Sequence, residues 1–281
     1  MAHSRRTLLA AAGLGMLSAC APRRALRSGA ASGARSTPPK SPSPSLPVSR
    51  EQVVARFGGA KPTRWGMDFP GITTRLATSE KVVALTFDAC GGPHGNGYNG
   101  ALIELLRQRR VPATLFLNGR WIAANIDVFH QLAADPLFQI GNHGTRHCPL
   151  SVSGQSAYGI AGTKDAGEVF DEIATNHARL TQLLGSPPRF FRAGTAHCDD
   201  VAVRIVAELG ERVVNFDING DAGATFNLTQ VEQAVIKARP GSIVIGHMNQ
   251  PASGTTQGMA AAIGRLAASG FRFVPLSGYV R

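Results

Sequence analysis

The chain has 281 residues, and 43% of them are hydrophobic, which is enough for one substantial globular core. The formal net charge is +11, but eight of the 29 Lys and Arg residues and none of the 18 Asp and Glu residues lie in residues 1–50. The rest of the chain is nearly balanced in charge, which argues against nucleic acid as a partner of the folded part.

The first predicted element, residues 1–20, is an export signal. Arg5 and Arg6 precede an apolar run that ends at Leu17 and is too short for a mature transmembrane helix. The arginine pair resembles a twin-arginine signal, and the Leu-Ser-Ala-Cys stretch that ends at Cys20 resembles a bacterial lipobox. We expect export to the periplasm or cell envelope, with a lipid on Cys20 as a membrane anchor. An ordinary cleaved signal and an uncleaved apolar anchor are the alternatives.

The next two segments differ in composition from the rest of the chain. Residues 21–50 are rich in Pro, Ser, Ala, Gly and Arg, which predicts a semi-extended linker. Residues 51–77 have no clear pattern and form a transitional segment. Regular hydrophobic patterning then predicts a single folded domain over residues 78–281.

Within this domain, predicted strands alternate with predicted helices. Apolar and β-branched runs predict strands at 82–88, 113–117, 137–140, 189–192, 212–218, 242–246 and 271–276. The stretches between them predict helices at 101–110, 121–134, 165–184, 200–209, 229–238 and 257–268. This alternation predicts an α/β fold with a parallel sheet, either a barrel or an open sheet.

Polar residues stand in or just after five of these strands. They are Asp88, His143, Arg192, Asp217 and His247. Because the carboxyl ends of barrel strands share the face that carries the active site, we expect these side chains to meet there. His147 follows His143 by four residues, a spacing that places both imidazoles on one side of a turn and suits a divalent metal.

The motifs in this order resemble the NodB-type polysaccharide deacetylases, the family 4 carbohydrate esterases. Residues 86–88 resemble the first family motif, Thr-Phe-Asp-Asp-Gly, and residues 142–147 resemble the second, His-Ser/Thr-x-x-His. Residues 191–195 stand in place of Arg-x-Pro-Tyr, and residues 215–221 in place of Asp-x-x-Asp-Trp. Residues 243–247 match the fifth motif, a strand that ends in Leu-x-His or similar. The resemblance implies a distorted (β/α)7-type barrel.

The resemblance also implies catalytic roles for individual residues. Asp88 matches the general base, and Arg192 the arginine that orients this base. His247 matches the general acid that protonates the leaving amine. Either Asp217 or Asp221 matches the acid that orients the catalytic histidine.

A divalent metal, with zinc expected, is implied as the cofactor. In the family it polarises the acetamide carbonyl and activates a water molecule. His143 and His147 match its histidine ligands, but the family's metal-binding Asp falls on Ala89. We favour Asp88 itself as the missing ligand, which would leave water activation to another acid. The candidates for that acid are Asp199 and Asp200.

Two further residues are alternatives for the missing ligand. Cys90 would supply a thiolate, which favours zinc, although a small buried residue under a tight Gly-Gly turn is the stronger interpretation of this cysteine. His94 in the following loop is the other alternative.

The third and fourth motifs depart from the family in the residues that contact the substrate. Thr195 stands near the family tyrosine, whose backbone N–H steadies the oxyanion, and a backbone donor tolerates such a change. The fourth motif lacks its Trp, and Phe226, Trp121 or Tyr98 would replace that wall of the sugar pocket. We therefore expect Thr195 and Phe226 to contact the substrate.

Two cysteines are expected to lie on the same barrel face. Cys148 directly follows His147, and Cys198 lies in the loop after Arg192. A Cys148–Cys198 disulfide is one hypothesis, and two free thiols are the alternative.

The sequence thus predicts a hydrolase that removes the N-acetyl group from an N-acetylhexosamine-containing polysaccharide or oligosaccharide at the cell envelope. The expected partner is the N-acetylated glycan itself. The main alternative, motivated by Ala89, is a catalytically inactive deacetylase fold that binds glycan. Metal-dependent hydrolysis of an O-acetyl ester or another linear amide is a third hypothesis.

Overall fold

The computed structural model describes residues 46–280, which fold as one unit. The predicted export signal, the lipobox cysteine Cys20 and most of the predicted linker lie outside the described residues. Among the helices of the described part, none combines the length and the apolarity needed to cross a bilayer.

The fold is built on a nine-stranded sheet, accompanied by a two-stranded antiparallel pair. The strand order of the large sheet is β2-β8-β6-β5-β4-β3-β10-β9, and β11 pairs with the first residues of β3. All neighbouring strands in this sheet are parallel. Its strands are β2 (Ile72–Thr73), β3 (Val82–Ala89), β4 (Ala113–Leu117), β5 (Phe138–Asn142), β6 (Phe190–Phe191), β8 (Arg212–Val214), β9 (Ile218–Asn219), β10 (Ser242–His247) and β11 (Arg272–Phe273). The antiparallel pair is β1 (Trp65–Gly66) with β7 (Cys198–Asp199).

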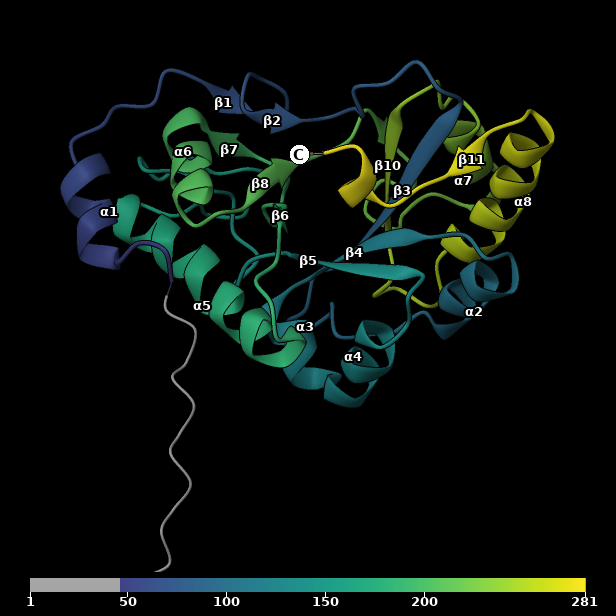
Figure 1. Ribbon diagram of the computed structural model, residues 1–281, viewed down its shortest axis with the longest axis horizontal. Coiled ribbons are helices and arrows are strands. Elements are labelled where there is room, and N and C mark those ends of the chain that lie inside the picture. Colours follow the sequence, from purple (N-terminus) through teal and green to yellow (C-terminus); the bar gives the residue numbers. More distant parts are fainter. Residues whose placement is uncertain (1–45, 281) are drawn as a thin grey trace, which may run out of the picture. The chain divides into compact units, whose positions relative to one another are not determined.

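The sheet is curled, with β2 and β9 at the two ends of the strand order (Figure 1). A single antiparallel bridge joins Arg75, just after β2, to Ser242 at the start of β10. The predicted α/β single domain with a parallel, barrel-like sheet is therefore confirmed, although this sheet carries more and shorter strands than the pattern predicts. The predicted strand at 212–218, for example, divides into β8 and β9, which pair with different partners.

The helices cover the outside of the sheet. They are α1 (Arg50–Phe57), α2 (Gly100–Gln108), α3 (Gly119–Ala124), α4 (Ile126–Ala133), α5 (Ala166–Leu184), α6 (Asp200–Glu208), α7 (Leu228–Val235) and α8 (Thr255–Ala268), followed by a 3-10 turn at Leu276–Gly278. The predicted helix at 121–134 is interrupted at Asn125, whose side chain donates to the carbonyl groups of Trp121 and Asn96. Helix α5 ends at Gly185 in the left-handed conformation, as its sequence predicts.

The transitional segment 51–77 contributes to the fold. Helix α1 begins at a capping box on Ser49 and packs against α5, and Val53 and Phe57 are buried in the core around α5 and α6. Strand β2 joins the main sheet beside β8. In Figure 1 this segment runs from α1 along the top of the view to β1 and β2.

Apolar strands form the core on which the site rests. Every residue of β3 and β4 is buried, and the aliphatic faces of α2, α7 and α8 pack against them. Full burial on both faces explains why these strands appear in the sequence as unbroken apolar runs. The polar residues that follow them are held on a rigid base.

Candidate active site and metal centre

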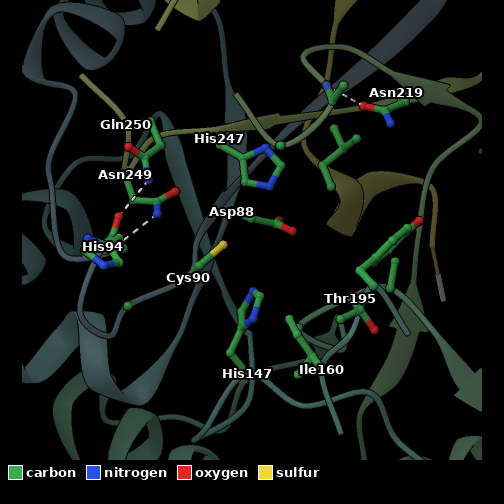
Figure 2. Close-up of a pocket in the computed structure, with 18 of the residues that line it drawn as sticks. Asp88, Cys90, His94, His147, Ile160, Thr195, Asn219, His247, Asn249 and Gln250 are labelled. Atoms are coloured by element: carbon green, nitrogen blue, oxygen red, sulfur yellow. Dashed lines mark hydrogen bonds between the residues drawn. The ribbon is translucent and has the colours of Figure 1, made fainter. Parts of the chain in front are cut away.

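A pocket of about 600 Å³ opens at the carboxyl ends of the sheet strands (Figure 2). Its floor contains Asp88, Cys90, His147 and His247. The position agrees with the expectation that the strand-end residues share one face.

Asp88 lies at the end of β3 and is paired with a buried arginine. Its side chain is 3% exposed, and the Nη1 group of Arg192 donates to Asp88 Oδ1 over 2.7 Å. Burial alone would raise the pKa of Asp88, but the Arg192 guanidinium together with His143 and His247 outweighs it and lowers the pKa below its ordinary value. Asp88 is therefore an ionised carboxylate whose second oxygen remains available.

Arg192 itself is fully buried and fixed from several directions. Its remaining N–H groups donate to Thr86 Oγ1 and to the backbone carbonyls of Val214 and Asn215. Its guanidinium also lies 4.2 Å from the centre of the Phe116 ring. These contacts satisfy the buried charge and hold the arginine in one orientation toward Asp88.

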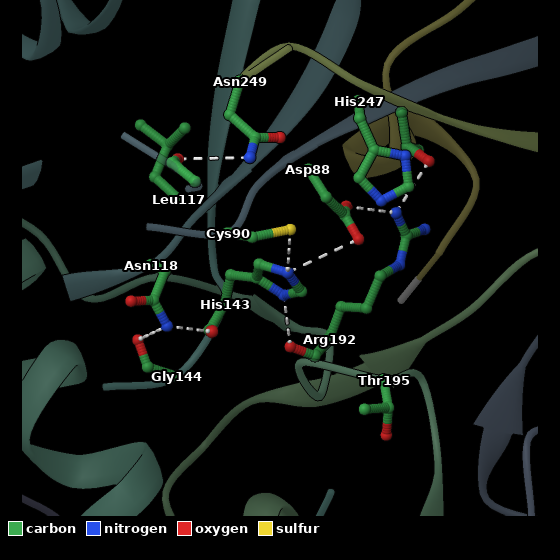
Figure 3. A network of polar contacts seen from close by, with 12 residues as sticks. Asp88, Cys90, Leu117, Asn118, His143, Gly144, Arg192, Thr195, His247 and Asn249 are labelled. Atoms are coloured by element: carbon green, nitrogen blue, oxygen red, sulfur yellow. Dashed lines mark hydrogen bonds and ion pairs between the residues drawn. The ribbon is translucent and has the colours of Figure 1, made fainter. Parts of the chain in front are cut away.

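His143 is held in one tautomer by the backbone. Its Nδ1 lies 2.8 Å from the carbonyl oxygen of Arg192, which can only accept, so Nδ1 carries the proton. The lone pair of Nε2 is then free, 3.6 Å from Asp88 Oδ2 and 3.9 Å from Cys90 Sγ. Figure 3 shows this imidazole between the carboxylate and the thiol. This orientation is the one that metal-binding histidines adopt.

Cys90 completes a cluster with the two histidines. One ligand atom each from Cys90, His143 and His147 lies within 4.8 Å of the others. Burial would raise the pKa of the Cys90 thiol, but contacts with His143, His147 and His247 outweigh it and lower the pKa well below its usual value. The expected preference for Asp88 over Cys90 as third ligand is thus not favoured by the geometry. Strand alternation explains the outcome, because Cys90 is two residues beyond Asp88 and points to the same side.

His147 has a ring nitrogen that lacks a hydrogen-bond partner. Its Nε2 is buried and has no hydrogen-bond partner among residues 46–280. Its backbone has a φ of 67°, in the left-handed region that costs a non-glycine residue roughly 1–2 kcal/mol. A strained backbone with an unpaired, buried ring nitrogen is typical of a residue that is held for a ligand.

His247, at the end of β10, is oriented by Asp221. Its Nδ1 lies 2.8 Å from Asp221 Oδ1, and its backbone N–H donates to Asp221 Oδ2 over 2.7 Å. Burial would lower the pKa of His247, but the hydrogen bond to Asp221 together with the contact to Cys90 outweighs it and raises the pKa well above its usual value. Thr255 Oγ1 also donates to Asp221 over 2.9 Å.

Asp217, the other candidate for this role, belongs to a separate network. It pairs with Arg75 and accepts from Ser242 Oγ and from the backbone N–H of Ile243. This network lies at the start of β10, whereas His247 lies at its end. Of the two alternatives, Asp221 is the residue that contacts His247, because β9 and the loop that follows it bring Asp221 to the carboxyl end.

The other proposed repairs for Ala89 do not reach the cluster. The Asp199 carboxylate caps α6 and accepts from the backbone of Val152, and Asp200 accepts from the backbone of Thr63 and Arg64. Both acids therefore serve structural turns rather than a water in the pocket. His94 lines the mouth of the pocket, outside the Cys-His-His cluster. Ala89 is fully buried in the core.

The pocket wall differs from the expected one. Thr195 lines the pocket, as expected, but Phe226 packs against the core outside it, and Trp121 is fully buried with its indole N–H on the carbonyl of Gly97. The aromatic residues that line the pocket are instead Phe216 and Tyr158, and Tyr158 is 75% exposed. Sequence reasoning missed it because Tyr158 lies in a loop without periodic pattern, between β5 and α5.

Tyr158 is part of a small aromatic cluster. Its ring meets the imidazole of His197 edge-on at 5.2 Å, and His197 in turn lies 5.7 Å from the ring of Trp65. Ile160 and Met67 line the pocket beside it. Apolar and aromatic walls around a few polar groups are typical of sites for small organic ligands.

The proposed Cys148–Cys198 disulfide is absent. The three described cysteines, Cys90, Cys148 and Cys198, are all free. Cys198 is the first residue of β7 and is fully buried in the apolar core, and burial raises the pKa of its thiol. Cys148 is half-buried beside Arg146 and Glu172. The two side chains therefore occupy different environments, an apolar core and a polar loop.

Comparisons with known proteins agree with the fold. Residues 75–214 match the family model described as polysaccharide deacetylase. The chain is 30% identical over 152 residues to a chitin deacetylase of Pestalotiopsis and 23% identical over 178 residues to a peptidoglycan N-acetylmuramic acid deacetylase of Bacillus subtilis. These matches cover 53% and 60% of this chain and span 46% and 61% of the two relatives.

A solved structure with the same fold comes from Bacillus anthracis. It is described as a family 4 carbohydrate esterase pseudoenzyme, and it matches with a TM-score of 0.63 and 23% identity over 76% of this chain and 70% of that one. A mutant of that protein is described as having restored enzymatic activity. At this level of identity the likeness concerns the fold.

Proposed function

The chain belongs to the polysaccharide deacetylase family, and on that premise we propose that it hydrolyses the N-acetyl group of an N-acetylhexosamine-containing glycan. The named relatives act on chitin and on peptidoglycan, which share such sugars. The reaction would use a divalent metal, with zinc expected, held by Cys90, His143 and His147. The expected export signal would bring this reaction to the cell envelope.

The observation that carries the proposal is the fit between these three residues and a metal. The Nδ1 of His143 is fixed by a backbone carbonyl, which leaves its Nε2 3.9 Å from the Cys90 sulfur, and the Nε2 of His147 is buried without a partner among residues 46–280. The lowered pKa of Cys90 makes the thiolate accessible. A set of one thiolate and two imidazoles suits zinc. The bound metal would supply Lewis-acid activation of the acetamide carbonyl and of the attacking water.

The chain's own residues would handle the protons. Asp88 would take a proton from the attacking water through Oδ2, because Oδ1 is occupied by Arg192. His247 would give a proton from Nε2 to the leaving amine, because its Nδ1 is engaged by Asp221. One group is held ionised at low pH and the other is held protonated at high pH, as an acid–base pair requires.

Cys90 as ligand leaves Asp88 free for this chemistry. If Asp88 bound the metal, the pocket would need another base, and neither Asp199 nor Asp200 points into it. With Cys90 as ligand, each buried titratable group at the pocket floor has one role. The replacement of the family's aspartate by Ala89 is then compensated one residue later in the chain.

The glycan would lie across the pocket mouth. Tyr158 offers an exposed ring against which a sugar face can pack, and residues 194–196 also line the pocket. This stretch contains Thr195, whose backbone N–H is the family's expected oxyanion donor.

Acetate release tests the proposal. We expect the purified protein to release acetate from N-acetylglucosamine oligomers, to lose this activity with a chelator, and to regain it with zinc. His143→Ala should lack both metal and activity. A well-folded protein that binds metal and these oligomers but releases no acetate would support the alternative, an inactive glycan-binding protein, for which the Bacillus anthracis pseudoenzyme is a structural precedent.

A further inference from the structure

A carboxylate from α5 lies against the loop that carries His147. Glu172 is 1% exposed, and its Oε1 accepts from the backbone N–H groups of residues 145–148 over 2.9 to 3.3 Å. Its Oε2 accepts from the backbone N–H and the Nε of Arg146. Four consecutive backbone donors therefore converge on one buried carboxylate, the arrangement that binds anions elsewhere in proteins.

The same loop is held from its other side. The side-chain amide of Asn118 donates to the carbonyls of His143 and Gly144 over 2.9 and 3.0 Å (Figure 3). The carbonyls at the start of the loop are thus bound by an amide, and the N–H groups at its end by a carboxylate. Both bonding directions of this backbone are satisfied by side chains from neighbouring helices, Asn118 being the N-cap of α3.

Two local features depend on this carboxylate. Gly144 has a φ of 72°, and a Cβ there would lie 2.5 Å from Glu172 Oε1, so the carboxylate and a side chain at position 144 exclude each other. His147 has the left-handed backbone described above, and its own N–H is one of the four donors, 2.9 Å from Oε1. The Glu172 carboxylate thus binds directly to the residue whose strained backbone orients the His147 ring.

We propose that Glu172 is a positioning residue for the metal site, which holds His147 in its ligating conformation. The inference rests on the proposed function, since it takes His147 as a ligand. Glu172 is neither a member of the Cys-His-His cluster nor a pocket-lining residue, and it reaches His147 through the backbone of residues 145–148. Its place in the sequence carries a signal: it lies on the buried face of α5 with Val169, Ile173 and Asn176, where an unpaired carboxylate would be costly.

The test compares metal affinity in folded variants. Glu172→Gln keeps the size of the side chain and removes its charge, so we expect the zinc dissociation constant to rise about 10- to 100-fold, the scale typical of residues behind a metal ligand. Asp171→Asn is the matched control, because this neighbour on α5 is about half exposed and pairs only with Arg50. The control should bind zinc as the wild type does.

A double-mutant cycle separates positioning from general stability. If Glu172 acts through His147, Glu172→Gln should weaken zinc binding in the wild type and add little in a His147→Ala background. Equal zinc affinity of wild type and a folded Glu172→Gln would overturn the inference, and so would an equal loss in both backgrounds.

A measurement without metal keeps the two proposals distinct. Hydrogen exchange at the amides of residues 145–148 should be slow in the wild type and much faster in Glu172→Gln. A wild type that binds no zinc but protects these amides would sink the proposed metal site and leave the loop contact intact. Unprotected amides in the wild type would contradict the contact itself.

Discussion

Two halves of the pocket are built in different ways. In the proton-transfer half, Asp88 and His247 lie at the ends of adjacent parallel strands, and each meets one buried partner of opposite charge, Arg192 and Asp221. In Figure 2 these two side chains lie on the same side of the pocket. Strand geometry and ion pairing fix this half.

In the ligand half, Cys90, His143 and His147 come from residues beyond the strand ends. Their placement depends on backbone contacts, such as the Arg192 carbonyl on His143 and the Glu172 carboxylate behind His147. The proposed acid and base are thus placed by strand register, whereas the two proposed histidine ligands are placed by loop contacts. Variants in the proton-transfer half should therefore lose activity while they keep the metal, and variants in the ligand half should lose the metal.

Asp88→Asn should give the largest difference between the loss of activity and the loss of metal. This variant removes the base but none of the three proposed ligands, so catalysis should fall roughly 10³-fold or more with metal content retained. The measurement is kcat for acetate release together with elemental analysis of the same sample. If Asp88→Asn loses the metal along with the activity, Asp88 is a metal ligand and the division of the pocket into two halves is wrong.

The next effect concerns pH and the Asp221 partner of His247. In the proposed mechanism Asp88 is ionised and His247 is protonated. On the acidic side, activity should fall as the pH drops through the lowered pKa of Asp88. On the basic side, activity should fall as the pH rises through the raised pKa of His247. Asp221→Asn removes the carboxylate that raises the pKa of His247, so the basic limb should move to lower pH. We also expect a fall in kcat of about 10²-fold.

The pH profile of kcat/KM checks this prediction, and Asp217→Asn is the control because Asp217 lies in the Arg75 network. A basic limb that is unchanged in Asp221→Asn, or displaced in Asp217→Asn, would reassign the residue that orients His247.

The smallest effect is expected at the rim, which belongs to neither half. Tyr158→Ala removes an exposed ring and should raise KM for N-acetylglucosamine oligomers by about 5-fold, the loss of roughly 1 kcal/mol in a packing contact, with kcat nearly unchanged. Phe226→Leu, at a position packed against the core, should leave KM unchanged. Equal KM values for wild type and Tyr158→Ala would remove the ring from the substrate path.

The same division explains what the sequence can predict. The strand-end residues Asp88, Arg192 and His247 stand out because buried apolar runs end in polar groups, and parallel strands bring such ends together. The register of the fourth motif could not be fixed, because β9 is only two residues long and the loop after it decides which aspartate reaches His247. The spacing of residues along the sequence cannot show whether Asp217 or Asp221 contacts His247.

Residues that act through loops were harder to identify. The sequence favours Asp88 over Cys90 as the third metal ligand, because ligand type and motif position point to the acid. Simple alternation from Asp88 nevertheless brings the Cys90 thiol to the same side. Tyr158 lacks any periodic neighbour, and Glu172 reaches the loop only after α5 has packed beside it. Contacts between distant segments, rather than local propensity, determine these positions.

The identity of the third ligand is the central claim, and cobalt substitution tests it most directly. A cobalt-loaded wild type should show a thiolate-to-cobalt charge-transfer band in the near ultraviolet, with one metal per chain. Cys90→Ser should lose this band and bind cobalt more weakly, whereas Cys148→Ser, which removes the half-buried thiol next to His147, should keep both. A Cys90→Ser variant that keeps the metal and the wild-type spectrum, while Asp88→Asn loses its metal, would contradict the account and make Asp88 the ligand.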